Sequence, residues 1–164
     1  MIEYKGITLK EATLEDIPFI ESYVLEDHQY ADMPIKAMTT SIHETQKYPI
    51  LILNEESLVG FFILQKNKLI EIFPMSDTSL FLRDHSIDER FQEKGFGKLS
   101  IEALPFYIKD RFDNIDEVVL AVDYDNLSGQ MLYLKTGFKD TKKRYKEKNS
   151  FKFIYSKKLK NSSE

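Results

Sequence analysis

Two glycines that stand one residue apart, Gly95 and Gly97, constrain the fold of this chain more than any other feature of its sequence. They lie in RFQEKGFGKLS, residues 90–100, and are two of only 6 glycines in 164 residues. The segment before them, SLFLRDHSI, is rich in strand formers, and the segment after them places apolar residues at helical spacing. A strand, a glycine loop and a helix in this order present unpaired backbone N–H groups at the positive end of a helix, where phosphate binds well. The pattern therefore predicts an α/β fold with an anion site at the glycine loop.

Three kinds of phosphate loop use closely spaced glycines, and the residues around Gly95 distinguish them. The Walker A pattern requires glycine at position 92 and serine or threonine at position 99, where this chain has Gln92 and Leu99. The dinucleotide pattern GxGxxG requires glycine or alanine at position 100, where this chain has Ser100. The pattern that fits is Q-x-x-G-x-G, from Gln92 to Gly97.

The rest of the chain alternates segments that are typical of strands and of helices. Thr13 and Asp16 resemble a capped helix start, and we expect that helix to run to about Asp27. Two runs of strand formers, YPILILN and LVGFFILQ, are separated by polar residues and predict a β-hairpin. Pro105 is expected to kink the helix that follows the glycines. The other expected elements are strands at 4–10, 79–87, 117–122 and two within 138–158, a short helix within 28–48, and a helix at 126–136 closed by Gly137.

No linker, repeat or low-complexity segment divides the chain, so its length predicts one domain over residues 1–164. Apolar residues make up 42% and charged residues 30%, which is typical of a globular protein and argues against intrinsic disorder. The net charge is -4, yet residues 139–160 contain many more Lys and Arg than acids. Such a basic segment can bind RNA, or its lysines can deter edge aggregation of a solvated strand pair. We favour the second interpretation, because no nucleic-acid-binding motif accompanies the basic residues.

Several classes of site lack the residues that they need. The chain has no cysteine, which rules out disulfides, CxxC zinc sites and a Cys nucleophile. His28, His43 and His85 form no HxxxH or HExxH pair, so no metal site is expected, and no serine lies in a GxSxG motif. The N-terminus has no apolar h-region, and no apolar run approaches the roughly 18 residues of a membrane span. We therefore expect a cytoplasmic protein with no membrane partner.

A second motif, DNLSGQMLYLKTGF at residues 125–138, follows the predicted strand EVVLAV and ends in Tyr-x-x-x-Gly-Phe. Together with SIDERFQEKGFGK, these segments resemble, in order and spacing, the GNAT superfamily of acyl-CoA-dependent N-acetyltransferases. The resemblance is specific over residues 80–138 and extends to the whole chain by element order. It implies an α/β (α+β) fold with a mixed, mostly antiparallel sheet flanked by helices, acetyl-CoA as cosubstrate and an amine as acceptor. A homodimer is implied by analogy alone.

The resemblance also implies roles for particular residues. The pyrophosphate of acetyl-CoA would lie on the loop made by Gln92, Glu93, Lys94, Gly95, Phe96, Gly97 and Lys98. Backbone groups near Ser86 and Ile87 would pair with the pantetheine amides as an added strand does. Asn126 would contact the cosubstrate, and Tyr133 would face the departing sulfur and act as general acid.

Acetyl transfer to an amine makes demands that follow from its chemistry. An alkylamine has a pKa of about 10.4 and must lose a proton before it attacks, so a base or a chain of waters is expected. Asp84 and His85 lie on the strand before the loop, and the sequence does not decide between them and water, because strand parity is lost at a bulge. Backbone N–H groups on a splayed strand would stabilise the charge on the carbonyl oxygen.

Asn126 and Tyr133 also have purely structural interpretations. Asn126 is a natural helix N-cap. Leu127, Met131 and Leu134 are predicted to form the buried stripe of the same helix, and Tyr133 lies off that stripe, which favours catalysis over packing.

Two questions about function stay open at the level of the sequence. The leading hypothesis is an enzyme that acetylates an amine of a small molecule or peptide by direct transfer, and the alternative is a non-catalytic acyl-CoA-binding regulatory module. The acceptor is expected to be selected by residues 27–46, by residues 66–78 and by the last hairpin. Glu26, Asp27 and Asp32 would attract a cationic amine.

Overall fold

The protein, in a computed structural model, has a mixed β-sheet at its centre, and the structure describes residues 1–41, 46–66, 75–147 and 149–160. Within these residues the sheet has 8 strands in the spatial order β1-β2-β3-β4-β5-β6-β8-β7. The strands are β1 (Ile2–Tyr4), β2 (Ile7–Glu11), β3 (Lys47–Asn54), β4 (Ser57–Gln65), β5 (Ser79–Ile87), β6 (Glu117–Asp123), β7 (Lys139–Glu147) and β8 (Ser150–Lys158). β5 and β6 run parallel, and the other neighbouring pairs are antiparallel. The predicted mixed, mostly antiparallel sheet is confirmed.

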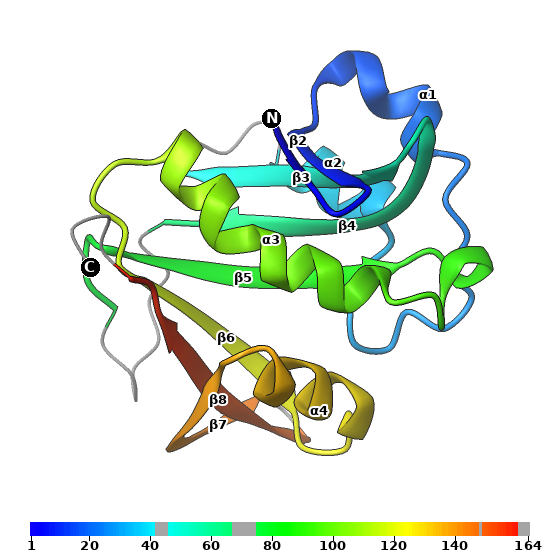
Figure 1. Cartoon of the computed structure of the whole chain (residues 1–164). Coiled ribbons are helices and arrows are strands. Elements are labelled where there is room, and N and C mark those ends of the chain that lie inside the picture. The colour runs from blue at the N-terminus through cyan, green and yellow to red at the C-terminus, as the bar shows by residue number, and fades with distance from the viewer. Residues whose placement is uncertain (42–45, 67–74, 148, 161–164) are drawn as a thin grey trace.

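Helices cover both faces of the sheet (Figure 1). They are α1 (Ile17–Ile20), α2 (Pro34–Ser41), α3 (Phe96–Arg111) and α4 (Leu127–Lys135), with 3-10 turns at Leu14–Asp16 and Glu89–Phe91. α3 packs on one face, and α1 and α2 pack on the other face of the N-terminal strands. α3 continues to Arg111 with Pro105 inside it. Among the described residues, each helix is too short or too polar to cross a bilayer.

The hairpin predicted from YPILILN and LVGFFILQ is confirmed, and it forms the middle of the core. Its two strands are buried on both faces because side chains alternate between the two helical layers. The side chains toward α3 are those of Ile50, Ile52, Phe62 and Leu64, and those toward α1 and α2 are Leu51, Phe61 and Ile63.

The single strand expected at residues 4–10 is wrong, because the chain reverses within it. Lys5 and Gly6 both have positive φ, at 44° and 91°, and join β1 to β2 with Tyr4 opposite Ile7. Two successive positive φ angles produce the tight hairpin turn whose twist matches that of the flanking strands.

The helix expected from Thr13 to Asp27 begins as predicted but ends at Ile20. The Thr13 N–H donates to Asp16 Oδ2 at 2.8 Å, as expected of a capping box. Beyond the helix, Val24 donates its N–H to Asp88 Oδ2 at 2.8 Å and accepts the Glu89 N–H. These bonds to the end of β5 replace the next helical turn.

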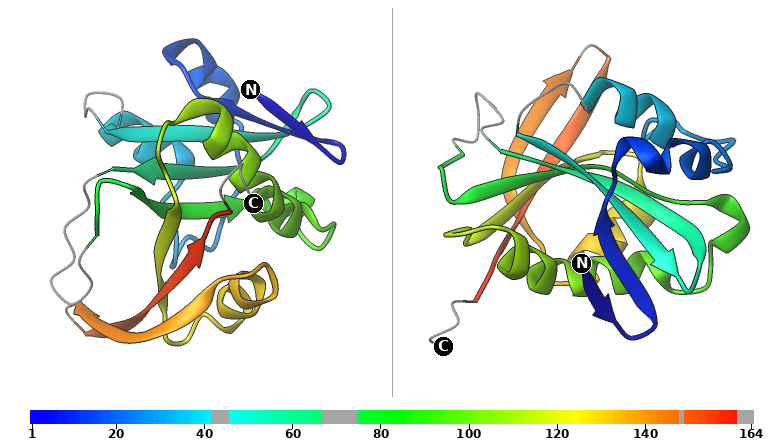
Figure 2. Two further views of the ribbon diagram at one scale, coloured as in Figure 1. Left: turned by 60° about the vertical axis from the view of Figure 1, so that its left-hand side comes forward. Right: turned by 90° about the horizontal axis from the view of Figure 1, so that it is seen from above.

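The two parallel strands separate part-way along their length. β5 and β6 pair from Ser79 opposite Glu117 to Leu82 opposite Leu120, and they then diverge, as Figures 1 and 2 show. The second half of β5 therefore has β4 on one side and no strand on the other among the described residues.

Candidate functional site

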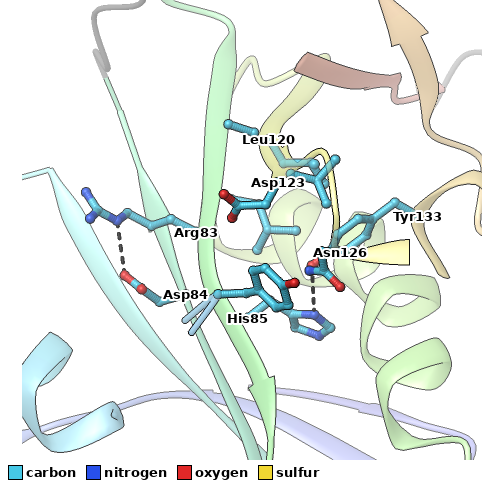
Figure 3. A pocket seen from close by; sticks show the side chains of 11 residues that line it. Arg83, Asp84, His85, Leu120, Asp123, Asn126 and Tyr133 are labelled. Atoms are coloured by element: carbon cyan, nitrogen blue, oxygen red, sulfur yellow. Dashed lines mark hydrogen bonds and ion pairs between the residues drawn. The ribbon is translucent and has the colours of Figure 1, made fainter. Parts of the chain in front are cut away.

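A cavity of about 50 Å³ lies where β5 and β6 separate (Figure 3). Polar side chains from β5, from β6 and the turn after it, from α4 and from the segment before α2 line it. They are Arg83, Asp84, His85, Asp123, Asn126 and Tyr133, with Tyr30 at the rim. A larger groove of about 840 Å³ lies at the C-terminal end of α3 and contains none of the predicted site residues.

A β-bulge decides which side chain of β5 turns toward α3. Asp84 and His85 together lie opposite the single residue Phe62, and Asp84 has φ of 54°. Leu80 and Leu82 face α3, so strict alternation would place Asp84 on that face as well. The extra residue moves His85 there instead, where its Nε2 lies 2.9 Å from Ser100 Oγ.

The Asp84 side chain lies on the face of the sheet opposite to α3, where hydrogen bonds hold it. Its Oδ1 accepts the Asp32 N–H at 3.0 Å, and its Oδ2 accepts from Arg83 Nε at 3.1 Å. Figure 3 shows the Arg83–Asp84 pair directed away from Tyr133.

Tyr133 reaches the cavity from α4 and meets His85. The Tyr133 hydroxyl lies 3.3 Å from His85 Nδ1, and its ring packs edge-on against Phe138 with ring centroids 5.8 Å apart. Burial raises the pKa of Tyr133 and lowers the pKa of His85 to about 4. Both side chains are therefore neutral at physiological pH.

The orientation of α4 corrects one expectation. Leu127, Met131 and Leu134, predicted to be its buried stripe, are 68%, 55% and 48% exposed. The helix instead turns Tyr133 inward, and Gln130 Nε2 donates to the carbonyls of the preceding turn at 2.9 Å. Tyr133 faces the cavity because of this packing. The argument that Tyr133 lies off a buried stripe was therefore wrong, because the three stripe residues are exposed.

Positions 95 and 97 differ in what requires glycine there. Gly95 is the N-cap of α3 and has φ of 86°, a left-handed conformation that favours glycine. Gly97 lies in the first turn of α3, and a Cβ there would meet nothing closer than Leu132 Cδ2, at 3.5 Å. Nothing in the described protein excludes a side chain at position 97, so packing does not explain the glycine there.

The other residues of the predicted loop surround this helix start. Gln92 donates from Nε2 to the Ile87 carbonyl at 2.9 Å and so ties the loop to the end of β5. Phe96 packs on Phe91. The side chains of Glu93, Lys94 and Lys98 are exposed. Ser86 Oγ is 2.8 Å from the Tyr23 hydroxyl, so its side chain belongs to the other face of the sheet.

Asn126 is an N-cap and a cavity residue at once. Its Oδ1 accepts the Gly129 N–H at 3.0 Å, and a Cβ at residue 129 would lie 2.5 Å from Asn126 Nδ2. Glycine at 129 therefore leaves room for the cap. Within the described chain Nδ2 has no hydrogen-bond acceptor, which leaves it available to a ligand in the cavity.

Two residues with clear roles in the site were not predicted. Ser100 is fully buried and contacts His85, and its position three residues after Gly97 was the one available signal. Asp88 is fully buried and accepts from Arg90 and from the Val24 N–H, which fastens the segment after α1 to β5. Such a long-range bond leaves no local pattern in the sequence.

A family comparison agrees with this arrangement. The Acetyltransferase (GNAT) family matches residues 11–138, which is well over half of the chain. The chain belongs to the GNAT acetyltransferase family. The acetyltransferase is also 29% identical over 143 residues to YbbJ of Bacillus subtilis (strain 168), described as an uncharacterized N-acetyltransferase; the match covers 85% of this chain and 89% of YbbJ.

Solved structures share the fold of the acetyltransferase at low identity. AAC(6')-Ib in complex with ribostamycin and coenzyme A has a TM-score of 0.75 at 12% identity, covering 94% of each chain. The spermidine N-acetyltransferase of Vibrio cholerae, in complex with CoA and spermine, has a TM-score of 0.66 at 20% identity, covering 94% of this chain and 96% of that chain. At these identities the likeness establishes the fold alone.

The acetyltransferase is an acetyl-CoA-dependent enzyme that transfers acetyl to an amine, and its site fits that cosubstrate. The start of α3 offers backbone N–H groups beside the unencumbered Gly97, and Asn126 Nδ2 is unpaired within the described chain. Among the described residues, no three His, Asp or Glu side chains gather as a metal ion would require.

Proposed function

We propose that the acetyltransferase moves acetyl directly from acetyl-CoA to an amine of a small molecule or peptide, with Tyr133 as general acid. The observation that carries this proposal is the Tyr133 hydroxyl beside the part of β5 that no described strand covers, where Gln92 Nε2 donates to the Ile87 carbonyl. An extended pantetheine arm pairs with that edge near Ser86 and Ile87, as an added strand would. Its thioester then lies in the cavity, within reach of a proton donor for the leaving thiolate.

The same placement brings the pyrophosphate to the start of α3. Residues Gln92 to Lys98 surround it, with the N–H groups of the first helical turn and the exposed Lys94 and Lys98 as donors. Asn126 donates from Nδ2 to the pantetheine arm.

The rim of the cavity favours an acceptor that carries positive charge. Tyr30 lines the cavity and is 39% exposed, and the pKa of Tyr30 is raised first by partial desolvation and then by Asp125, Asp123 and Asp27. Asp123 is already paired with Lys152 at 3.9 Å, so Asp27 and Asp125 are the carboxylates near Tyr30 that would attract a cation. This fits the expectation placed on Asp27, whereas Asp32 is already paired with Lys36 at 3.6 Å.

Release of the CoA thiol in the presence of a panel of amines tests the acceptor. We expect polyamines and basic peptides to accelerate release more than monoamines of equal basicity that carry no further positive charge. The chain has no cysteine, so a thiol reagent reports CoA without interference. If no amine accelerates release while acetyl-CoA still binds, the proposal fails in favour of a non-catalytic acyl-CoA-binding module.

Direct transfer predicts that both substrates are bound before CoA leaves. Initial rates measured at several concentrations of each substrate are expected to give intersecting double-reciprocal lines. Parallel lines, together with acetyl found covalently on the protein, would instead indicate an acyl-enzyme.

Gly97→Ala is expected to weaken acetyl-CoA binding by about 10- to 100-fold, the equivalent of one hydrogen bond to a charged group. The new Cβ contacts Leu132 at an ordinary distance, so the protein folds, and alanine raises helix stability by up to about 1 kcal/mol. Calorimetry and a thermal melt measure the two effects.

Gly95→Ala serves as a comparison of stability and not of binding, because Gly95 belongs to the same loop and its φ of 86° makes the same substitution strained. It is expected to lower the melting temperature. Unchanged acetyl-CoA affinity in folded Gly97→Ala would contradict the placement of the pyrophosphate.

A further inference from the structure

The hydrogen bonds around His85 define which of its nitrogens carries the proton. Ser100 Oγ lies 2.7 Å from the Gly97 carbonyl oxygen, and two oxygens at this distance require a hydrogen between them. A carbonyl only accepts, so the single hydroxyl hydrogen of Ser100 points to Gly97. The contact of 2.9 Å between Ser100 Oγ and His85 Nε2 must then be donated by His85.

Neutral histidine carries one N–H, so Nδ1 of His85 is bare and accepts. The atom that faces it is the Tyr133 hydroxyl, at 3.3 Å, and the Tyr133 proton is therefore directed at His85. The chain of donors runs in one direction, from Tyr133 through His85 and Ser100 to Gly97. Because the Tyr133 hydrogen is directed at His85, the lone pairs of the Tyr133 oxygen are available to other groups. Tyr133 can therefore accept a proton from a substrate as well as donate one.

We propose that His85 holds the proton that Tyr133 takes from the amine, and that the pair returns this proton to the CoA sulfur. This inference rests on the proposed role of Tyr133. His85 acts through Tyr133 and is a positioning residue, which takes up the second proton of the amine, whereas the first proton leaves to water before the amine attacks.

Starting from the neutral amine, the step balances without any further reactant. The amine nitrogen bonds to the acetyl carbon, and its surplus proton passes to Tyr133 Oη while the phenolic proton passes to His85 Nδ1. The tetrahedral species collapses and the C–S bond breaks. The thiolate takes a proton from Tyr133 Oη, which recovers its own from His85, and both residues end as they began.

The surroundings of Tyr133 and His85 favour release of the proton from His85 over its retention. Burial lowers the pKa of His85 to about 4, whereas a thiol has a pKa of about 8.5, so a proton on His85 passes readily to a thiolate. Asp84, the neighbouring carboxylate on β5, is bonded to Arg83 and to the Asp32 N–H and does not stabilise a charged imidazole. The Phe62 ring, with its centroid 6.1 Å from that of His85, adds an apolar wall.

His85→Asn and His85→Gln test the proposal. Asparagine keeps an acceptor near the Nδ1 position and glutamine keeps a donor near the Nε2 position, but neither amide holds a proton. In each folded variant we expect the single-turnover rate to fall about 100-fold, the lower end for acid–base catalysis, with the KM for acetyl-CoA within about twofold of wild type. The matched control is Ile50→Val on β3, a fully buried core position on a strand that does not neighbour β5, which is expected to lower the melting temperature without this loss of rate.

The double variant with Tyr133→Phe provides the second readout. Residues that act as one unit have non-additive effects, so His85→Asn is expected to slow the Tyr133→Phe enzyme by less than about twofold. A near-wild-type rate in either folded His85 variant, or full additivity, would overturn the shuttle. Normal turnover by Tyr133→Phe alone would instead overturn the proposed function on which the shuttle rests.

Discussion

Tyr133→Phe is expected to lower kcat by about 10² to 10⁴, the range typical of a lost general acid. The substitution keeps the ring and its edge-on contact with Phe138 and removes only the hydroxyl. The hydroxyl makes one long hydrogen bond, to His85, so the free energy of unfolding is expected to change by no more than about 1 kcal/mol. Affinity for acetyl-CoA is expected to stay close to that of wild type.

The rate at saturating substrates and a thermal melt of the same preparation separate catalysis from packing. A packing role predicts the reverse result, which is a modest loss of stability with near-normal turnover. If product release limits kcat, a single-turnover experiment supplies the comparison. A wild-type rate in that experiment would remove Tyr133 from the mechanism and leave water as the proton donor.

Asp88→Ala is expected to lower the free energy of unfolding by about 2–3 kcal/mol, the usual cost of leaving a buried N–H without its acceptor and losing charge-assisted hydrogen bonds, since Arg90 itself is 53% exposed. Asp88 is fully buried and accepts from the Val24 N–H at 2.8 Å and from Arg90 Nη2 at 2.7 Å. Its loss leaves the Val24 N–H without its acceptor and frees the segment after α1 from the end of β5. Denaturant unfolding measures the effect.

Asp140→Ala is the matched control, because Asp140 also pairs with an arginine, Arg144, at 2.9 Å but at a more exposed position. We expect it to cost about 1 kcal/mol or less. Equal effects of the two substitutions would show that burial of Asp88 adds nothing to stability.

The contribution of Asp88 is expected to depend on pH. Burial by itself would raise the pKa of Asp88, but hydrogen bonds from Arg90 and from the Val24 N–H outweigh burial, and the pKa lies below its usual value. A carboxyl whose pKa is lower in the folded state stabilises the protein above its unfolded pKa of about 3.9 and loses this effect as the pH falls through the folded pKa. The difference in unfolding free energy between wild type and Asp88→Ala should therefore be largest above about pH 4 and should shrink below it. If the difference in unfolding free energy stayed constant down to acidic pH, the lowered pKa of Asp88 would be contradicted.

Much of the fold was predictable because its signals are local. The β3–β4 hairpin, the α3 segment after the glycines and the two final strands have runs of apolar residues, turn residues and caps that act within a few positions. The errors lie where distant residues compete with local preference. The helix after Thr13 stops early because Val24 bonds to Asp88 and Glu89, 64 and 65 positions along the chain.

The sequence by itself determined the family, the glycine loop and the presence of Tyr133 and Asn126 at their spacing, because these depend on the order of residues along one segment. The tertiary structure decided which side chains meet. An extra residue in β5 turns His85 rather than Asp84 toward α3, and the packing of α4 turns Tyr133 inward while Leu127 stays exposed. Strand parity and helix rotation are set by partners from other parts of the chain, and a shift of one residue in either changes which groups face the cavity.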